Sequence, residues 1–369
     1  MPKKILDGSL LLVEGAVKAG VEYYSGYPIT PANRIYFNSV NRVPYVLKAP
    51  DEITALQWAS GVAAAGRLPM TGTSHAGFSL MLETFDMAFM MELPVVIMIA
   101  QRLGPSTGSA TTGAQGDVSM FNRLTSGGYN VPVFTPSNLK DCYELAGKSV
   151  QVAAGYRTPV VLLTSKEMIQ TKRSFEVDDL PELDRAKLEY FQGEDYLPYD
   201  PGDGLVPDFL SLGNGEHQVR MTASTHNKEG ILSKADPESM ENTARLNKKI
   251  ETGAEEFSYY ELDEDVDAET LIVSYGITSY ASREALETLR ENGHPASLLL
   301  VKTLLPVTEE VKDIVTSYSD VVIAEENLMG QYRRILYGEI EGPGVSAVNA
   351  IGHMISPSEI VREVKSGGI

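Results

Sequence analysis

The sequence predicts two α/β domains, each built around a largely parallel sheet. Along residues 8–165, helical segments with recurring apolar positions alternate with short strand-like segments. The strand-like segments are apolar throughout, as in PVVIMIA (94–100), which is typical of a parallel sheet covered by helices on both faces. The alternation returns over residues 268–327 after a long polar interval, and 369 residues exceed what one hydrophobic core usually supports.

The elements of the first domain follow one another without an internal repeat. The segment GSLLLVEGAVKAG (8–20) has helical spacing and leads into a short strand that ends at the Tyr27–Pro28 turn. The next expected elements are a helix at 51–66, a strand and turn at 68–74, a helix at 78–93, a strand at 94–102, and a helix followed by a buried strand within 138–165. We expect these strands to pair in one sheet.

A long polar interval separates the two domains. From about residue 176 to 250 the pattern weakens into Pro, Gly, Asp and Glu, with one charged helix expected at 234–251. Residues 268–327 then predict a strand, a glycine turn, a helix, a strand, a helix and a strand. The predicted boundaries place the first domain at 1–250, including this interval, and the second at 251–369.

Composition and charge exclude several classes of function. The formal net charge of −19 argues against a nucleic-acid partner, because such partners are bound by clustered Lys and Arg. Much of the acidic charge lies in 175–200 and 255–269, which we expect to be solvated connections rather than cation sites. No apolar run reaches the ~18 residues of a membrane helix, and the start MPKKILDGSL lacks a secretory signal, which predicts a cytoplasmic protein without a membrane partner.

The single cysteine limits the redox and metal chemistry of the chain. Cys142 alone permits no internal disulfide, and it cannot supply the thiolates of an iron–sulfur cluster or a thiolate zinc site. Any cluster must therefore lie on another chain.

A stiff loop follows the first predicted strand. In Tyr27-Pro28-Ile29-Thr30-Pro31 each proline fixes its own φ and restricts the residue before it. Such a loop at the end of a strand in an open α/β sheet lies where ligands bind. The residues alone fit a plain strand-to-helix turn equally well.

Carboxylates open the next predicted helix. Asp51 and Glu52 occupy a position where the helix dipole and free N–H groups favour negative charge. On one interpretation Asp51 is a cap and Glu52 a first-turn charge. On the other, Glu52 points into a cleft and transfers a proton.

Two later loops carry basic side chains. Ser74 and His75 lie in a glycine-containing turn before a helix, which leaves N–H groups free to meet an anion or a planar ring. His75 could carry a proton, although a lone histidine in a turn is more often packed or solvated. Arg102 is the first charge after an apolar strand and could bind a carboxylate or phosphate through two hydrogen bonds; a surface arginine is the alternative.

These blocks, in this order, resemble the α subunit of the 2-oxoacid:ferredoxin oxidoreductases, which are thiamine diphosphate and iron–sulfur enzymes. The first-domain blocks that carry the resemblance are GYPITP (26–31), DEITALQWASG (51–61), TGTSHAGFSLMLE (71–83) and QRLGPSTGSATTGAQGD (101–117). GEHQVRMTASTHNKEG (215–230) resembles the family's linker, and SYGITSYASREALETLRENG (274–293), LLLVKTLLPV (298–307) and IAEENLMGQ (323–331) resemble its transketolase C-terminal-like second domain.

The resemblance implies a shared active site. The first domain would be the pyrimidine-binding half of a thiamine diphosphate site, and a β subunit would supply the half that binds the diphosphate and magnesium. Iron–sulfur clusters would lie on partners, which include the β subunit, probable γ and sometimes ferredoxin-like δ subunits. The implied reaction is oxidative decarboxylation of a 2-oxoacid, with electrons passing to ferredoxin and the acyl group to coenzyme A.

The resemblance also implies roles for individual residues. Glu52 matches the glutamate that hydrogen-bonds the aminopyrimidine ring and would act as the acid/base residue. Thr30 matches the loop threonine near the substrate oxygens, and Arg102 the arginine that faces the 2-oxoacid carboxylate. Pro28, Ile29, Ser74 and His75 are expected beside the cofactor.

The sequence departs from the family pattern at two places that affect the substrate. Many relatives have SGPG where this chain has Ser74-His75-Ala76-Gly77, so a basic ring enters the cofactor loop. After Pro31, Arg34 could meet a second carboxylate, as 2-oxoglutarate would need, or it could lie on a helix surface. The favoured substrate is 2-oxoglutarate.

No metal site is predicted on this chain. Gly202-Asp203-Gly204 and Asn227 have nearly the spacing of a thiamine diphosphate and magnesium motif, but the segment between them is polar and turn-prone rather than strand-helix-strand. Two other functions stay open: another thiamine diphosphate enzyme of transketolase or decarboxylase type, and a non-catalytic scaffold of the same fold.

Overall fold

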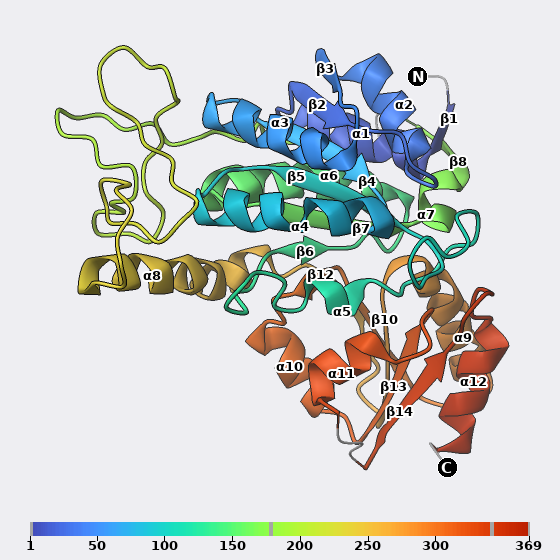
Figure 1. Cartoon of the computed structure of the whole chain (residues 1–369). Coiled ribbons are helices and arrows are strands. Elements are labelled where there is room, and N and C mark those ends of the chain that lie inside the picture. The colour runs from blue at the N-terminus through green and yellow to red at the C-terminus, as the bar shows by residue number, and fades with distance from the viewer. Residues whose placement is uncertain (1–2, 177–179, 340–342, 368–369) are drawn as a thin grey trace.

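The first sheet of the protein has seven strands. The computed structural model describes residues 3–176, 180–339 and 343–367 and is shown in Figure 1. The strands lie in the order β12 (Thr303–Leu305), β6 (Val133–Phe134), β7 (Val160–Ser165), β5 (Val96–Gln101), β4 (Pro69–Thr73), β2 (Tyr23–Gly26) and β3 (Tyr45–Lys48). All neighbours run parallel except β12, which is antiparallel to β6. The predicted parallel α/β fold is confirmed.

Helices cover both faces of this sheet. In the view of Figure 1, α3 (Glu52–Ala64) and α4 (His75–Met90) lie in front, and α1 (Gly8–Lys18) and α6 (Leu139–Tyr156) lie behind. The rear core also includes α2 (Asn33–Arg42) and α7 (Lys166–Gln170). Because both faces are covered, every residue of the central strands β5 and β7 is buried, which explains their continuous apolar sequences.

The second sheet has five strands, in the order β14 (Val345–Asn349), β13 (Asp320–Glu325), β10 (Thr270–Ser274), β11 (Ser297–Val301) and β9 (Tyr260–Asp263). Only β9 is antiparallel to its neighbour. One face of this sheet packs with α9 (Ser279–Glu291) and α12 (Pro357–Ser366). The other face, with α10 (Glu309–Thr316) and α11 (Gln331–Tyr337), joins the core under α3 and α4. The two sheets therefore share one continuous apolar core.

Two expectations for the second half differ from the structure. The second predicted strand of that half is split at Lys302 into β11 and β12, which belong to different sheets. At this crossing the Lys302 ammonium lies 2.9 Å from a carboxylate oxygen of Asp141 in α6, which covers the first sheet, and 3.7 Å from Glu261 of β9 in the second. The acidic segment 255–269, expected to be a solvated connection, contains the edge strand β9.

The smaller elements complete the architecture. Strands β1 (Lys4–Asp7) and β8 (Lys172–Phe175) form a separate antiparallel pair. The remaining short elements are α5 (Val118–Phe121) and the 3-10 turns η2 (Ala254–Phe257) and η3 (Gly276–Thr278). Within the described part of the chain, no helix is both long enough and apolar enough to cross a bilayer.

The polar interval is fixed to the first sheet by buried charges. The charged helix expected at 234–251 is α8 (Pro237–Gly253), which starts with Asp236 as cap and Pro237 in the first turn, a position where proline is favoured. From α8, Arg245 and Lys249 both pair with Glu92 at the end of α4, and the Lys249 ammonium lies 2.6 Å from the Glu92 carboxylate. These contacts hold α8 against the sheet (Figure 1).

Candidate active site

Glu52 lies at the start of α3 with its side chain 7% exposed. The helix begins there because the Asp51 carboxylate accepts a hydrogen bond of 2.7 Å from the Thr54 amide. This bond holds the pKa of Asp51 below its ordinary value. Asp51 therefore performs the capping, and the Glu52 carboxylate is left for another role.

The start of α4 meets the Glu52 carboxylate. A Cβ at Gly77 would lie 2.8 Å from Oε1 of Glu52 and 2.2 Å from Oγ1 of Thr73, so only glycine allows this approach. Ser74 caps the helix without a side-chain capping bond, and its buried hydroxyl has no hydrogen-bond partner in the described part of the chain. A buried polar atom without a protein partner is costly unless a ligand or water supplies one, so this hydroxyl is available to a ligand.

Arg102 follows β5 and reaches the loop after β2. Its side chain is 6% exposed, and Nη1 donates a hydrogen bond of 2.6 Å to the Thr30 carbonyl. The Nε atom is buried without a partner among the described residues. A buried guanidinium with an unused donor is suited to bind an anion.

The residues at and after the loop between β2 and α2 differ in exposure and in their contacts. Pro28 is exposed, whereas Ile29 is half-buried and packs against the rear core. The Thr30 hydroxyl accepts a hydrogen bond of 3.3 Å from the side-chain amide of Asn33. Arg34 is 46% exposed and pairs with Asp7 at 3.2 Å, beside a pocket of about 410 Å³ that Thr30 also lines.

His75 is the first residue of α4 and is paired with an acidic side chain. Its Nδ1 lies 3.1 Å from Oδ1 of Asp117, and its side chain is 31% exposed. Asp117 raises the pKa of His75 above its ordinary value, while partial burial and Arg102 act in the opposite direction. Asp117 was not predicted from the sequence, because nothing in the local pattern shows which carboxylate meets His75.

Asp117 is in turn held next to Arg102. Its backbone amide donates a hydrogen bond of 3.1 Å to the side chain of Gln101, the residue before Arg102. The loop from β5 to Asp117 thereby returns to the end of β5. This brings His75 and Arg102 to the same edge of the sheet.

Gln115 fixes this loop to the second domain. Its side-chain amide donates to the Tyr275 carbonyl at 2.9 Å and accepts hydrogen bonds from the Thr278 hydroxyl and the Glu326 amide. At the next position, the Gly116 carbonyl accepts a bond of 2.7 Å from Gln331 of α11. Gln115 was not predicted from the sequence, since a glutamine in a loop gives no sign of a partner 160 residues away.

The structure therefore brings together residues that follow four strands, β2, β3, β4 and β5. Glu52, Ser74, His75 and Arg102 lie around the carboxyl ends of β4 and β5, and the Thr30 loop joins them through Arg102. Ligands of open α/β sheets bind at this edge.

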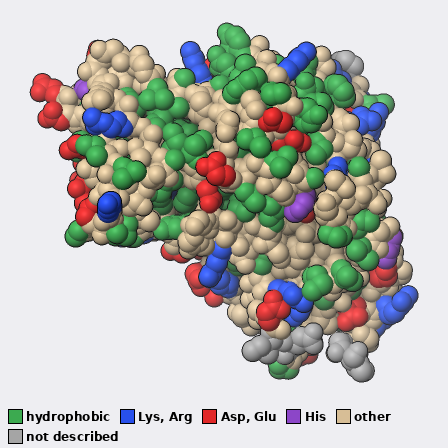
Figure 2. Space-filling model, in the orientation of Figure 1, with side chains coloured by type: hydrophobic (Ala, Val, Ile, Leu, Met, Phe, Trp, Pro, Cys, Tyr) green, Lys and Arg blue, Asp and Glu red, His purple; other side chains and the backbone are tan. Residues whose placement is uncertain are grey.

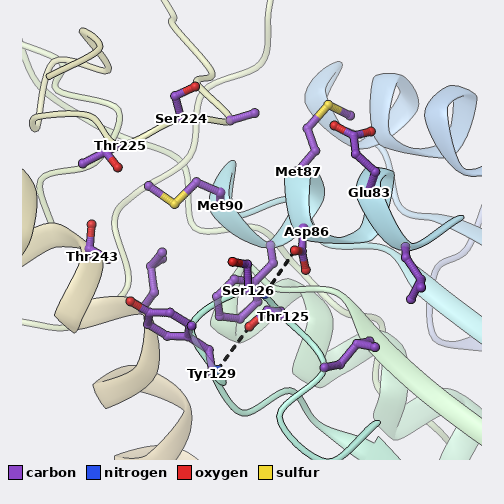
Figure 3. A pocket seen from close by; sticks show the side chains of 16 residues that line it. Glu83, Asp86, Met87, Met90, Thr125, Ser126, Tyr129, Ser224, Thr225 and Thr243 are labelled. Atoms are coloured by element: carbon purple, nitrogen blue, oxygen red, sulfur yellow. Dashed lines mark hydrogen bonds between the residues drawn. The ribbon is translucent and has the colours of Figure 1, made fainter. Parts of the chain in front are cut away.

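A separate, wider pocket lies at the other end of α4 (Figure 3). Its volume is about 970 Å³, and side chains of α4, the loop 124–129, residues 223–225 and α8 line it. Asp86 and Thr125 accept backbone hydrogen bonds across its floor. None of the residues predicted for the active site lines this pocket.

Comparisons with known proteins identify the family. Residues 14–245 match the family model described as pyruvate flavodoxin/ferredoxin oxidoreductase, thiamine diP-bdg, meaning thiamine diphosphate-binding. The chain belongs to this family. The resemblance that the sequence motifs indicate to the 2-oxoacid:ferredoxin oxidoreductases is confirmed.

Individual relatives of this oxidoreductase family extend over nearly the whole chain. The 2-oxoglutarate synthase subunit KorA of Methanocaldococcus jannaschii is 31% identical and covers 99% of this chain and 100% of its own. The ketoisovalerate oxidoreductase subunit VorB of Methanothermobacter thermautotrophicus is 28% identical, with 99% and 98% coverage.

A solved structure supports the same fold. A 2-oxoglutarate:ferredoxin oxidoreductase from Magnetococcus marinus, with 2-oxoglutarate, coenzyme A and succinyl-CoA bound, superimposes with a TM-score of 0.91 at 24% identity. It matches 100% of this chain, which spans 65% of that chain.

Proposed function

We propose that this protein is the α-type subunit of a thiamine diphosphate-dependent 2-oxoacid:ferredoxin oxidoreductase that acylates coenzyme A. The observation that carries the proposal is the buried Glu52 carboxylate held against the glycine turn of α4, beside Arg102. A proton-transfer group and a carboxylate-binding group thereby share one edge of the sheet.

The residues present fit the aminopyrimidine half of thiamine diphosphate. Gly77 allows the start of α4 to approach the Glu52 carboxylate, and the Ser74 hydroxyl is buried without a partner in the described chain. Glu52 would hold the ring, with Ser74 and His75 and the loop of Pro28 and Ile29 beside it. When bound, the cofactor supplies the carbanion chemistry that decarboxylation of a 2-oxoacid requires.

This chain's own residues would bind the substrate and move a proton. Glu52 would hold a proton at the ring nitrogen it faces, and burial keeps that carboxyl away from water. Arg102 would bind the 2-oxoacid carboxylate through its free donors while its bond to the Thr30 carbonyl fixes its orientation. Thr30 would stabilise negative charge on the substrate oxygen.

The other half of the site is proposed to lie on a β subunit. The outer face of α3 and α4, next to Glu52, exposes Ile53, Trp58, Leu80 and Leu82, and Figure 2 shows hydrophobic side chains spread over this face. Such a face is suited to bury against another chain. The β subunit would bring the diphosphate and magnesium half-site, and iron–sulfur clusters would lie on it and on γ or δ subunits.

The proposed substrate is 2-oxoglutarate, as in the KorA relative, although the VorB relative is named for ketoisovalerate. Arg34, for which a second carboxylate or a helix surface was expected, is engaged with Asp7, and its role in substrate binding stays a prediction. The proposed domain boundaries remain 1–250 and 251–369, with β12 as the segment of the second that enters the first sheet.

The proposal is tested with the native complex, purified through an affinity tag on this chain. Reduction of a viologen dye is measured with 2-oxoglutarate, pyruvate and 2-oxoisovalerate, with and without coenzyme A. We expect reduction that depends on coenzyme A and is fastest with 2-oxoglutarate. A complex with bound thiamine diphosphate that reduces the dye with none of these acids would support the scaffold alternative and overturn the proposal.

A further inference from the structure

The His75–Asp117 pair forms a cationic group at the rim of the proposed site. The Nδ1 atom of His75 faces Asp117 at 3.1 Å. Its Nε2 atom lies 3.5 Å from the Ser79 hydroxyl, at the weak limit of hydrogen bonding, and that hydroxyl already donates to the His75 carbonyl at 3.0 Å. The Nε2 atom is therefore left to donate to a ligand.

A second observation places a ligand at this end of α4. The Ser74 hydroxyl and the Arg102 Nε are buried polar atoms without partners in the described chain. They belong to the residue before His75 and to the residue after β5, and β5 is linked to Asp117 through Gln101. Arg102 also lies near enough to the imidazole to lower its pKa, so three donors of different depth lie at the same edge of the sheet.

The difference in depth matters for the number of carboxylates that can be bound. Arg102 is 6% exposed and faces the inner part of the site, whereas the His75 side chain is 31% exposed at the rim. A monocarboxylate needs only the inner cation. A 2-oxo acid with a second carboxylate needs another cation or donor several atoms farther out.

The charged groups around the imidazole are few. Asp117, from the loop after β5, favours the protonated ring. Arg102, from the end of β5, disfavours it. Glu52, from the start of α3, lies against Gly77 two residues farther along α4. Asp117 is thus the carboxylate in direct contact with the ring.

We propose that His75 is a specificity-determining residue whose imidazolium, positioned by Asp117, binds the second carboxylate of a 2-oxo dicarboxylate. This inference rests on the proposed function and assigns its substrate class to one side chain. Asp117 acts through His75 and is a positioning residue.

The experiment compares 2-oxoglutarate with 2-oxopentanoate, which has the same carbon chain but no second carboxylate. The ratio of their kcat/KM values is measured from pH 6 to 9 in the native complex. Because Asp117 raises the pKa of His75, the ratio should be high at low pH and fall as the pH rises through that pKa. The change should appear mainly in the KM for 2-oxoglutarate.

Variants separate the proposed role from a structural one. His75→Gln should lower the ratio about 10-fold at pH 6.5, the usual effect of losing one charged contact, and should remove its pH dependence. Asp117→Asn should move the fall of the ratio to lower pH. His353→Gln is the matched control, because His353 pairs with Glu359 at 3.2 Å in the second domain and should leave the ratio and its pH profile as in the wild type.

Three results would overturn the proposal. One is an unchanged ratio in His75→Gln, and another is an equal loss with both substrates, which a structural role would give. The third is a change of the ratio in Arg34→Gln but not in His75→Gln, which would assign the second carboxylate to Arg34. Failure of the proposed function differs from all three, since the wild-type complex would then turn over neither acid.

Discussion

Two buried glutamates of the first domain, Glu92 and Glu52, lie in opposite electrostatic surroundings. Glu92 is completely buried and pairs with Arg245 and Lys249 of α8. Burial alone would raise the pKa of Glu92, but Lys249 and Arg245 outweigh it and hold the pKa well below its ordinary value. Glu52 forms no ion pair in the described part of the chain, and the group set against its carboxylate is the glycine turn of α4.

The difference separates a structural charge from a functional one. The Glu92 carboxylate is itself fully engaged, because Arg245 and Lys249 both donate hydrogen bonds to it. Near Glu52, the Ser74 hydroxyl and the Arg102 Nε stay without partners. An arrangement that leaves buried polar atoms unsatisfied is expected where a ligand completes it.

The largest expected effect is on turnover at Glu52. Glu52→Gln in the native complex should lower kcat by about 10²- to 10⁴-fold, because the amide keeps the shape but cannot exchange the proton. The denaturation midpoint of the variant should stay close to that of the wild type, since no ion pair is lost. Steady-state dye reduction and thermal denaturation measure the two quantities. Near-normal turnover would contradict the assignment of Glu52.

The second expected effect is on stability at Glu92. Glu92→Ala should lower the free energy of unfolding by about 3 to 5 kcal/mol, because Arg245 and Lys249 would remain buried without their counter-charge. Urea denaturation of the purified chain measures the loss. The surface pair of Glu22 and Arg67 is a control, and Glu22→Ala there should cost under about 1 kcal/mol. A similar small cost at Glu92 would show that the cluster does not hold α8.

The third expected effect is on substrate affinity at Arg102. Arg102→Ala should raise the KM for the 2-oxoacid about 10- to 100-fold, because a charge-assisted bond to the carboxylate is lost. Arg102→Lys should recover only part of this loss, since lysine lacks the second donor of the guanidinium. A loss of complex assembly with unchanged KM would show instead that Arg102 serves the Thr30 loop.

The sequence predicted four of the seven strands of the first sheet, β2, β4, β5 and β7, because they are local patterns, whereas the short strands β3 and β6 were not predicted. The helix at 51–66 and the strand at 94–102 appear as α3 and β5, since period and burial are encoded in adjacent residues. The split at Lys302 was not predictable, because the ion pair with Asp141 joins residues far apart in the chain. Asp117 and Gln115 were not predictable for the same reason, because their partners lie in other elements.

A further buried glutamate, Glu326, lies in surroundings that differ from those of both Glu52 and Glu92. It follows β13, and its carboxylate accepts a bond of 3.3 Å from the Ile355 amide. In the described chain no Lys or Arg pairs with it, and His353 offsets its desolvation only in part. Desolvation, with a further contribution from Glu167, raises the pKa of Glu326 to about 7. The folded state therefore holds a proton that the unfolded state releases at lower pH.

The smallest expected effect is on stability at Glu326, and its direction with pH follows from the raised pKa. Between the ordinary pKa of 4.5 and about 7 the folded chain binds more protons, so stability falls as the pH rises through this range. Glu326→Gln removes the cost of a buried charge and should stabilise the chain at pH 8 by on the order of 2 kcal/mol relative to the wild type. Denaturation midpoints at pH 5 and pH 8 measure this difference, which should shrink at pH 5. An equal difference at both pH values would mean that Glu326, like Glu92, is ionised in the folded chain throughout this range.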